Sequence, residues 1–316
     1  MNDDWLDADA LAAKRILITG ADGMLGRGFQ AVLRAHFPAA TVLSRTRQQL
    51  DVTVGEDVLS EAHEPIDVII HCAADVDADR CERYATECHN VQVVGTKNVI
   101  DLARACDALI LYPQSFLIYG ESDGEVDEET PPDPQSTYAR CKLEAELMLR
   151  AADAKALIVR MGGFFGGDGR DKNFVGKFTR HLALMLRTGT PRYAVGSRLW
   201  QPTFTEDLAR NSLALLAAGK EGVWCMSCEG VASFHDVACE CVRQLGFENR
   251  VAIDHVEASA VPVADVARRP GRVVMSNQKL KAAGLYAQRR WQAALAEYLK
   301  RPWFDTLFHS FRNSGG

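Results

Sequence analysis

The sequence predicts an α/β protein built on a doubly wound parallel sheet, with a smaller, discontinuous C-terminal lobe. Three observations support this prediction. Short β-branched runs alternate with helical patterns through the first half of the chain, the first run leads into a glycine-rich turn, and the alternation fades after about residue 160. Strands that are apolar on both faces and joined by helices form parallel sheets that are covered on both sides.

The expected strands and helices alternate along the chain. The predicted strands are residues 15–19, 41–43, 67–72, 108–112 and 156–160. The predicted helices between them are residues 25–36, 90–105 and 137–151. Each helical stretch repeats apolar residues at three- and four-residue spacing, which gives the helix one face that packs on a sheet.

A glycine-rich turn follows the first predicted strand and opens the first helix. In this position Gly20 permits a tight turn, Gly23 lets a pyrophosphate approach backbone N–H groups at the helix N-terminus, and Gly26 allows close helix packing. A glycine turn selected only for packing is the alternative. The context predicts a dinucleotide site of the Rossmann type. Its expected cofactor contacts are Gly20, Asp22, Gly23, Met24, Leu25 and Gly26.

The end of the second predicted strand indicates which dinucleotide is bound. Many folds that prefer NAD carry an acid here for the ribose 2′-hydroxyl. Residues 41–47 contain no carboxylate, but they contain Arg45 and Arg47. Arginine suits the 2′-phosphate of NADP through charge-assisted hydrogen bonds, although a solvated loop is the alternative. We therefore expect NADP(H) to be favoured over NAD(H), with Ser44 and Arg45 as cofactor contacts.

The second half of the chain predicts how the domains are divided. Helices are expected at 174–187 and 206–218, and strand-like runs at 193–195 and 222–226 are expected to extend the main sheet. The predicted dinucleotide-binding domain therefore spans residues 1–165 and is completed by about 194–228. The remaining residues, 166–193 and 229–316, are predicted to form a substrate-binding lobe.

Three polar residues predict a catalytic site at one end of this sheet. Tyr138 and Lys142 are four residues apart and share one face of the helix that starts near Ser136. A nearby ammonium stabilises a phenolate and lowers the pKa of the tyrosine, although such pairs also occur by chance in helices. Ser115 ends the fourth strand, and ligands of doubly wound sheets bind at the carboxyl ends of strands.

The motifs together resemble the extended short-chain dehydrogenase/reductase family. Those that carry the resemblance are Gly20-x-x-Gly23-x-x-Gly26, His71-Cys72-Ala73-Ala74, Ser115 five residues before Gly120, and Tyr138-x-x-x-Lys142. Later segments are similar to one branch, the dTDP-4-dehydrorhamnose reductases and their relatives. These segments are residues 160–166, 173–175, 202–209 and 268–270.

The resemblance implies roles for individual residues. Ser115 would hydrogen-bond the substrate carbonyl, Tyr138 would donate the proton, and Lys142 would hold the nicotinamide ribose and lower the tyrosine pKa. Further implied cofactor contacts are Asp51, Val52, Cys72, Ala73 and Ala74. Implied substrate contacts are Gln114, Phe164, Asn173 and Arg269.

Two positions depart from the family pattern. Gln92 stands where the family commonly has Asn. The pair Gln114-Ser115 stands where the rhamnose-type reductases tend to have Thr-Asp, and here the chain is more similar to the epimerase and dehydratase branches. These departures concern the substrate and not the fold.

The implied activity is an NADPH-dependent reduction of the keto group of a nucleotide-linked 4-keto-6-deoxysugar. A nucleotide-sugar epimerase or dehydratase is an alternative, but such an enzyme usually adds an acid–base pair near the serine, and Gln114 and Phe116 offer none. A non-catalytic NADP-binding regulatory subunit is a second alternative. Retention of Ser115, Tyr138 and Lys142 argues against it.

The composition limits which classes of binding partner and which cellular compartment we expect. With 36 Lys+Arg against 42 Asp+Glu, the net charge is -6, and no basic stripe is present to bind nucleic acid. The sequence contains no apolar run of the ~20 residues that a membrane helix needs, and its N-terminus is acidic. Its nine dispersed cysteines suggest reduced thiols. We expect a cytoplasmic enzyme with a small-molecule partner, and the aromatic C-terminus to pack in the lobe or to form a homodimer contact.

Three further features are interpreted as structural. Cys225 and Cys228 have zinc-ligand spacing but belong to an apolar run, so no metal site is expected. The acidic run at 121–129 is interpreted as a solvated loop, with a Mg²⁺ or regulatory site as the alternative. His71 is interpreted as a core histidine, with an acid–base role as the alternative.

Overall fold

A six-stranded parallel sheet forms the centre of the molecule, in the order β11-β6-β4-β3-β1-β2. The computed structural model describes residues 7–257 and 266–312. The strands are β1 (Arg15–Thr19), β2 (Thr41–Arg45), β3 (Val68–His71), β4 (Leu109–Ser115), β6 (Ala156–Met161) and β11 (Gly222–Met226). Strand β2 lies on one side of β1, whereas β3 and the later strands lie on the other side, so the strand order changes direction between β1 and β3. Doubly wound sheets bind their ligands at this point.

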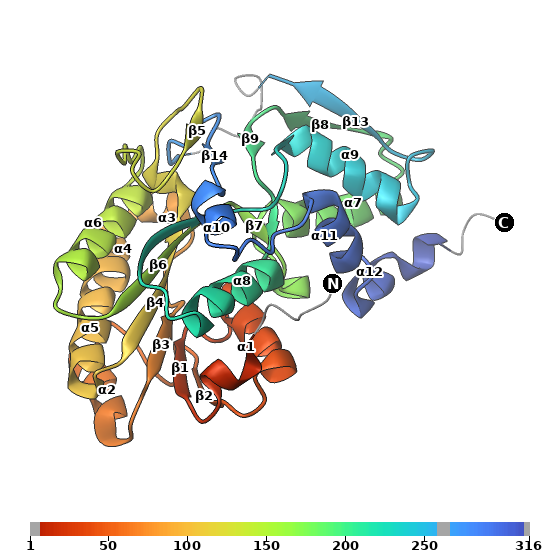
Figure 1. Cartoon of the computed structure of the whole chain (residues 1–316). Coiled ribbons are helices and arrows are strands. Elements are labelled where there is room, and N and C mark those ends of the chain that lie inside the picture. Colours follow the sequence, from red (N-terminus) through yellow and green to blue (C-terminus); the bar gives the residue numbers. More distant parts are fainter. Residues whose placement is uncertain (1–6, 258–265, 313–316) are drawn as a thin grey trace.

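Helices cover both faces of this sheet (Figure 1). On one face lie α2 (Gly55–Ser60), α5 (Gly95–Cys106) and α6 (Thr137–Ala151), and on the other lie α1 (Met24–His36) and α8 (Thr205–Ala217). Helix α1 buries Leu25, Phe29, Val32 and Leu33, whose three- and four-residue spacing forms one apolar stripe. The predicted strands and helices of the main sheet therefore lie where the sequence pattern placed them.

The predicted helix 90–105 contains a local irregularity. Helix α4 (Ala85–His89) continues through a π-helical turn, Asn90–Val94, into α5. In this turn the Thr96 hydroxyl donates to the carbonyl oxygen of Gln92 at 2.6 Å. A π-helical turn is a common feature near functional sites, and this one lies next to the carboxyl end of β3, since Thr96 also contacts His71.

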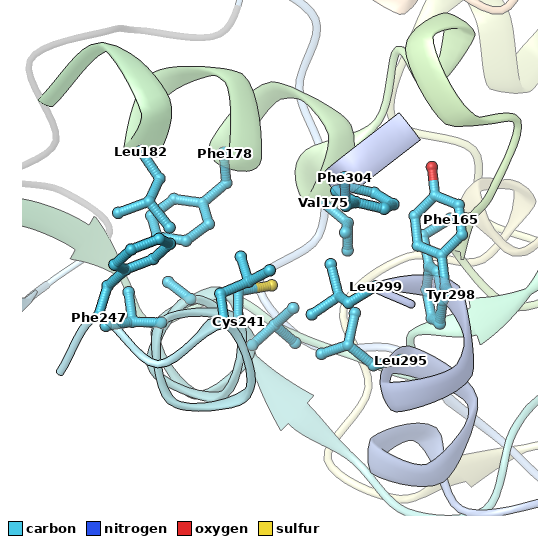
Figure 2. Packing of buried hydrophobic residues seen from close by; sticks show 14 of the residues in the cluster. Phe165, Val175, Phe178, Leu182, Cys241, Phe247, Leu295, Tyr298, Leu299 and Phe304 are labelled. Atoms are coloured by element: carbon cyan, nitrogen blue, oxygen red, sulfur yellow. The ribbon is translucent and has the colours of Figure 1, made fainter. Parts of the chain in front are cut away.

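The second lobe has its own apolar core (Figure 2). It is built from α7 (Phe174–Thr188), α9 (Phe234–Leu245), α11 (Trp291–Tyr298) and α12 (Pro302–Arg312). Phe178 and Leu182 of α7 face Cys241 of α9, while Leu295 and Tyr298 of α11 close the far side. The aromatic C-terminal residues Trp291, Phe304 and Phe308 are buried in this core, as the packing interpretation predicted.

Two segments lie differently from their predictions. The run 193–195 was expected in the main sheet, but it lies in β8 (Arg192–Gly196), which pairs with β13 (Ala252–Val256) in the second lobe. The short helix α10 (Gln278–Ala282) packs against the first domain, where Leu280 is fully buried. By contrast, β11 pairs with β6 as predicted. The proposed division of the chain therefore needs these two adjustments.

The remaining described elements are short. The strands are β5 (Glu125–Val126), β7 (Phe164–Phe165), β9 (Leu199–Trp200), β10 (Thr203–Phe204), β12 (Ala232–Ser233) and β14 (Val274–Met275). The helices are α3 (Ala78–Arg83) and the single turns Ala8–Leu11, Glu61–His63, Phe116–Ile118 and Asp168–Arg170. Within residues 7–257 and 266–312, none of the helices combines the length and the apolarity needed to cross a membrane.

Candidate active site

The turn between β1 and α1 has the backbone path that its glycines predict. Gly20 has a φ of 61°, a left-handed conformation that favours glycine. A Cβ on Gly20 would lie 2.7 Å from the backbone nitrogen of Ala73, and one on Gly26 would lie 2.6 Å from the carbonyl oxygen of Gly20. Both positions therefore exclude a side chain because backbone atoms occupy the space.

The N-terminus of α1 fits a pyrophosphate group. Its N-cap is Gly23, and no side chain of the described residues caps the helix there. The first N–H groups of a helix have no intrahelical acceptor and attract an anion. At Gly23 a Cβ would meet the Gly20 carbonyl oxygen at 3.2 Å, so only a glycine leaves this approach clear. The backbone N–H groups of Met24 and Leu25 are thus placed to hold a phosphate.

A loop from the second lobe borders this turn. The Arg170 guanidinium lies 3.4 Å from a carboxylate oxygen of Asp22, and the N–H of Lys172 points at the sulfur of Met24 at 3.4 Å. The two lobes therefore meet at the phosphate turn.

Arg45 is paired with a carboxylate that the sequence window did not contain. Its Nε and Nη2 donate to the two carboxylate oxygens of Glu61, at 2.7 and 3.0 Å. The side chain of Glu61 is 9% exposed, and the ion pair holds the pKa of Arg45 above its usual range. Ser44 donates to the side-chain oxygen of Gln30 on α1 at 3.0 Å. Glu61 lies outside residues 41–47, so the sequence window did not indicate this partner of Arg45.

The other expected cofactor segments lie around the same strand ends. Asp51 accepts hydrogen bonds from the N–H and the hydroxyl of Thr53, and these bonds lower its pKa. Val52 is buried, and its carbonyl oxygen accepts from Asn98 at 2.8 Å. Cys72, Ala73 and Ala74 are half-buried directly after β3, and burial raises the pKa of the Cys72 thiol to about 12.

His71 joins the ends of β1 and β3. It is 3% exposed, its Nδ1 lies 2.8 Å from the Thr19 hydroxyl, and its Nε2 lies 3.2 Å from the Thr96 hydroxyl. Burial, with a smaller effect of the Lys142 charge, lowers its pKa to about 3. The imidazole is therefore neutral at physiological pH, which favours the interpretation as a core histidine.

Ser115 and Tyr138 meet at the carboxyl end of β4. The Ser115 hydroxyl accepts the N–H of Leu117 at 3.2 Å, which caps the single turn that follows the strand. Tyr138 lies in the first turn of α6, a helix capped by the Ser136 hydroxyl through the N–H of Ala139. The Ser115 hydroxyl lies close enough to the Tyr138 phenol to lower the phenol pKa. The end of β4 and the start of α6 thus bring the two hydroxyl groups together.

Burial keeps the Tyr138 phenol in its protonated form. Burial is the largest influence and raises the phenol pKa, and the hydrogen bond with Ser115 opposes it. The neighbouring Cys81, Cys88 and Asp75 raise it further. The principal causes do not include the charge of Lys142, so the lowering of the tyrosine pKa that the resemblance implies stays a prediction. A neutral phenol at pH 7 can donate a proton.

Lys142 faces the strand instead. Its ammonium donates to the carbonyl oxygen of Pro113 at 2.8 Å and lies 3.9 Å from the ring centre of Tyr112. The side chain is 4% exposed, and burial lowers its pKa to about 7. Lys142 therefore lies one helical turn from Tyr138, but in this structure its charge is directed at the end of β4.

The expected substrate residues make contacts within the protein in this structure. Gln114 is 2% exposed and bonded inside the protein, so its assignment as a substrate contact is corrected. Asn173 is the N-cap residue of α7, and its amide donates to the carbonyl oxygen of Phe164 at 2.7 Å. Arg269 pairs with Asp79 on α3 at 2.9 Å. These last contacts place residues 266–269 beside the helix that borders Tyr138.

Three thiols near Tyr138 were not expected in the site. Cys81 of α3, Cys88 of α4 and Cys141 of α6 pack with Tyr138 and Ala267 in one buried cluster. The interaction with Cys141 lowers the pKa of Cys88, but the interaction with Cys81 and burial outweigh it and raise this pKa to about 12. Cys81 and Cys88 are near each other in the sequence, but Cys141 is distant from both, so no local pattern could have indicated that all three meet.

The two cysteines with zinc-ligand spacing are buried in the sheet region. Burial raises the pKa of both Cys225 and Cys228 to about 12, and the N–H of Cys225 donates to the Glu128 carboxylate at 2.6 Å. Glu128 lies in the acidic run at 121–129, which is therefore anchored to the edge strand β11. Two cavities, of about 340 and 370 Å³, lie toward the amino ends of β4 and β6, away from Ser115.

Comparison with known proteins gives consistent similarities. The family model described as "RmlD substrate binding domain" matches residues 14–303. A dTDP-4-dehydrorhamnose reductase of Mycolicibacterium smegmatis is 34% identical over 295 residues, covering 90% of this chain and 85% of the relative. A solved structure of a dTDP-4-dehydrorhamnose reductase from Clostridium acetobutylicum has a TM-score of 0.82 at 30% identity, covering 90% of this chain and 98% of that one. The Bacillus anthracis reductase, solved in complex with NADP, has a TM-score of 0.81 at 22% identity, covering 90% and 98%.

Proposed function

The chain belongs to the RmlD substrate-binding-domain family of extended short-chain dehydrogenases/reductases, and from this premise we propose that it reduces the keto group of a nucleotide-linked 4-keto-6-deoxysugar with NADPH. One observation carries the proposal. Ser115 and a protonated Tyr138 lie next to each other at the carboxyl end of β4, where the Ser115 hydroxyl acts on the phenol pKa, and the phosphate turn opens α1 at the same edge of the sheet. The names of the reductase relatives supply the substrate class.

In a ketone reduction the hydroxyl groups of Ser115 and Tyr138 would have different roles. Ser115 is placed to donate a hydrogen bond to the carbonyl oxygen, which polarises the carbonyl bond. Tyr138 is placed to transfer its phenol proton to the same oxygen, and the raised pKa keeps that proton available at neutral pH. Bound NADPH would supply the hydride to the carbonyl carbon. The product is an alcohol, and the phenolate regains its proton from water.

Residues at the strand ends would hold the cofactor. The N–H groups of Met24 and Leu25 would bind the pyrophosphate, while Asp51 and Val52 would border the adenine and Lys142 the nicotinamide ribose. The Bacillus anthracis relative holds NADP, which supports the same cofactor here. We propose a preference for NADPH over NADH through Arg45, restrained by its ion pair with Glu61.

The test is a turnover assay with the purified protein. We expect loss of NADPH absorbance with dTDP-4-dehydrorhamnose or dTDP-4-keto-6-deoxyglucose, and formation of the corresponding alcohol. Tyr138→Phe removes the proton donor, so its kcat should fall by ~10² to 10⁴-fold, while the NADPH Kd should stay nearly unchanged because the ring still packs.

The alternatives give different results in the same assay. An epimerase or dehydratase would convert the sugar nucleotide without net consumption of NADPH. A regulatory subunit would bind NADPH but show no turnover with any of the substrates. A folded Tyr138→Phe variant with wild-type kcat would contradict the proposed proton donor.

A further inference from the structure

We propose that Gln114 is a positioning residue that aligns the two halves of the active site through its side-chain amide. Its carbonyl oxygen accepts the backbone N–H of Ser115 at 2.8 Å. Its NH₂ group donates to the carbonyl oxygen of Lys142 at 2.9 Å and to the Glu146 carboxylate at 2.9 Å. One side chain thus joins the end of β4 to helix α6. The inference rests on the proposed function, in which both of these elements carry site residues.

The contacts of Gln114 require an amide. Two acceptors, on Lys142 and Glu146, face the nitrogen, while one donor, the N–H of Ser115, faces the oxygen. A carboxylate of the same shape has no hydrogen to donate and would face the Glu146 carboxylate. An asparagine is one methylene shorter. An apolar residue would leave buried polar groups without partners, at a cost of about 1 to 3 kcal/mol for each group.

A buried ion pair fixes the direction in which the amide points. Glu146 is 0% exposed and Arg160 is 1% exposed, and the guanidinium contacts the carboxylate at 2.5 and 3.3 Å. Arg160 also donates to the Tyr119 hydroxyl at 2.8 Å. Because the Glu146 carboxylate accepts from Gln114, the NH₂ end must face α6 and the oxygen must face Ser115. The ion pair therefore sets the orientation of the amide.

This arrangement also explains why Gln114 does not contact substrate. Its oxygen and both of its N–H positions are used inside the protein, and the side chain is 2% exposed. The expected effect of losing the amide is therefore a displaced Ser115 rather than a lost substrate contact. Ser115 acts on the developing oxygen charge, so the displacement should lower kcat more than it changes KM.

The kinetic experiment compares three variants of the full chain. Gln114→Glu keeps the shape and removes the donors, Gln114→Met keeps the length without polarity, and Gln292→Glu is a matched control at an exposed position on α11. We expect Gln114→Glu and Gln114→Met to lower kcat at least tenfold, with KM and the NADPH Kd within twofold of wild type. Gln292→Glu should match wild type in all three constants.

A second change tests the polarity argument. In the double variant Gln114→Glu with Glu146→Gln, the donor lies on residue 146 and the acceptor on residue 114, which restores one hydrogen bond between them. We expect kcat to recover at least threefold over Gln114→Glu alone. Wild-type kcat in both single Gln114 variants would overturn the proposal, as would equal losses in kcat and NADPH affinity.

A readout without substrate separates this inference from the proposed function. The amide resonance of Ser115 should shift in Gln114→Met, and its hydrogen should exchange faster, because methionine has no oxygen to accept it. An unchanged Ser115 amide would overturn the positioning role even in an active enzyme. If the wild type instead shows the expected amide behaviour but reduces none of the sugar nucleotides, the proposed function fails and the positioning role stands.

Discussion

Tyr138 and Lys142 lie one turn apart on α6, yet burial moves their pKa values in opposite directions. Burial disfavours the charged form of any group, so it raises the pKa of the phenol and lowers that of the ammonium to about 7. Tyr138 therefore stays neutral at physiological pH, while Lys142 titrates near it. Burial is the largest influence on the tyrosine pKa, and it keeps the phenol in the protonated form that suits a reductase.

The pKa of Lys142 predicts a pH-dependent contribution to stability. Between about pH 7 and 10.5 the unfolded chain keeps a proton on this lysine that the folded chain has lost. The free energy of unfolding should therefore rise with pH in this window, by at most about 1.4 kcal/mol per pH unit, and be flat below it.

The matched comparison is Lys142→Met without cofactor. Denaturant titrations at several pH values should show the stability difference between wild type and Lys142→Met changing from pH 7 to pH 10. The control is Lys97→Met, since the Lys97 side chain is 61% exposed and pairs with Asp101 on the surface. Parallel pH curves for wild type and Lys142→Met would show that this lysine keeps an ordinary pKa.

The ion pair of Arg45 predicts how cofactor choice can be changed. Glu61 neutralises the guanidinium that would otherwise bind the 2′-phosphate, and the pair is bidentate. Glu61→Gln should therefore lower the Kd for NADPH several-fold and leave that for NADH nearly unchanged, because only NADPH carries the extra charge. Calorimetry with both cofactors measures this. If Glu61→Gln and Arg45→Ala both leave the ratio of the two Kd values unchanged, Arg45 does not select the cofactor.

At the scale of elements, the turn between β1 and α1 has two glycines with different tolerances. A Cβ on Gly26 would meet backbone atoms at 2.6 and 2.9 Å, whereas one on Gly23 would meet a single oxygen at 3.2 Å. Gly26→Ala should therefore displace the turn, lowering the melting temperature and weakening NADPH binding at least tenfold. Gly23→Ala should keep a near wild-type melting temperature.

The branched variant Gly23→Val separates binding from folding. Its side chain would occupy the approach to the N–H groups of α1, so NADPH binding should be lost while the fold is kept. Calorimetry and thermal unfolding of the three glycine variants provide the comparison. Tight NADPH binding by folded Gly23→Val would mean that the phosphate lies elsewhere.

The sequence predicts which segments form strands and helices better than it predicts which of these elements contact each other. Apolar periodicity predicted the main strands and helices, because a packed face repeats along a single element. The three-residue run 193–195 predicted a strand but could not indicate its partner, β13, which lies some 60 residues further along. The two sets of partners that the sequence did not indicate have the same origin. The Glu61 partner of Arg45 and the α6 partners of Gln114 come from other elements, so neither contact leaves a local pattern.

At the scale of the whole molecule, α8 connects the two lobes. Helix α8 packs on α1 in the first domain, where Gly28 allows an approach to the backbone of Thr205. The Asn211 amide donates at 2.6 Å to the carbonyl oxygen of Leu285, which packs against the core of the first domain. Arg289 donates to the Asp207 carboxylate at 2.7 Å, and Asp207 is 4% exposed. The Arg289–Asp207 pair thus joins α8 to the second lobe, in addition to the contact between the lobes at the phosphate turn.

The Arg289–Asp207 pair predicts how strongly unfolding of the two lobes is coupled. Arg289→Met would leave the Asp207 carboxylate buried without its main partner, which typically costs about 3 kcal/mol or more. The surface pair Arg192–Asp254 is a matched control, since 67% of the arginine side chain is exposed, and Arg192→Met should cost less than about 1 kcal/mol. The double variant Arg289→Met with Asp207→Asn should recover part of the loss, because the buried charge is gone.

Denaturant unfolding followed by tryptophan fluorescence and by circular dichroism measures both stability and coupling. We expect coincident transitions in the wild type and in Arg192→Met, and separated transitions in Arg289→Met. Equal stability losses in the two arginine variants would show that the buried pair does not hold the lobes together.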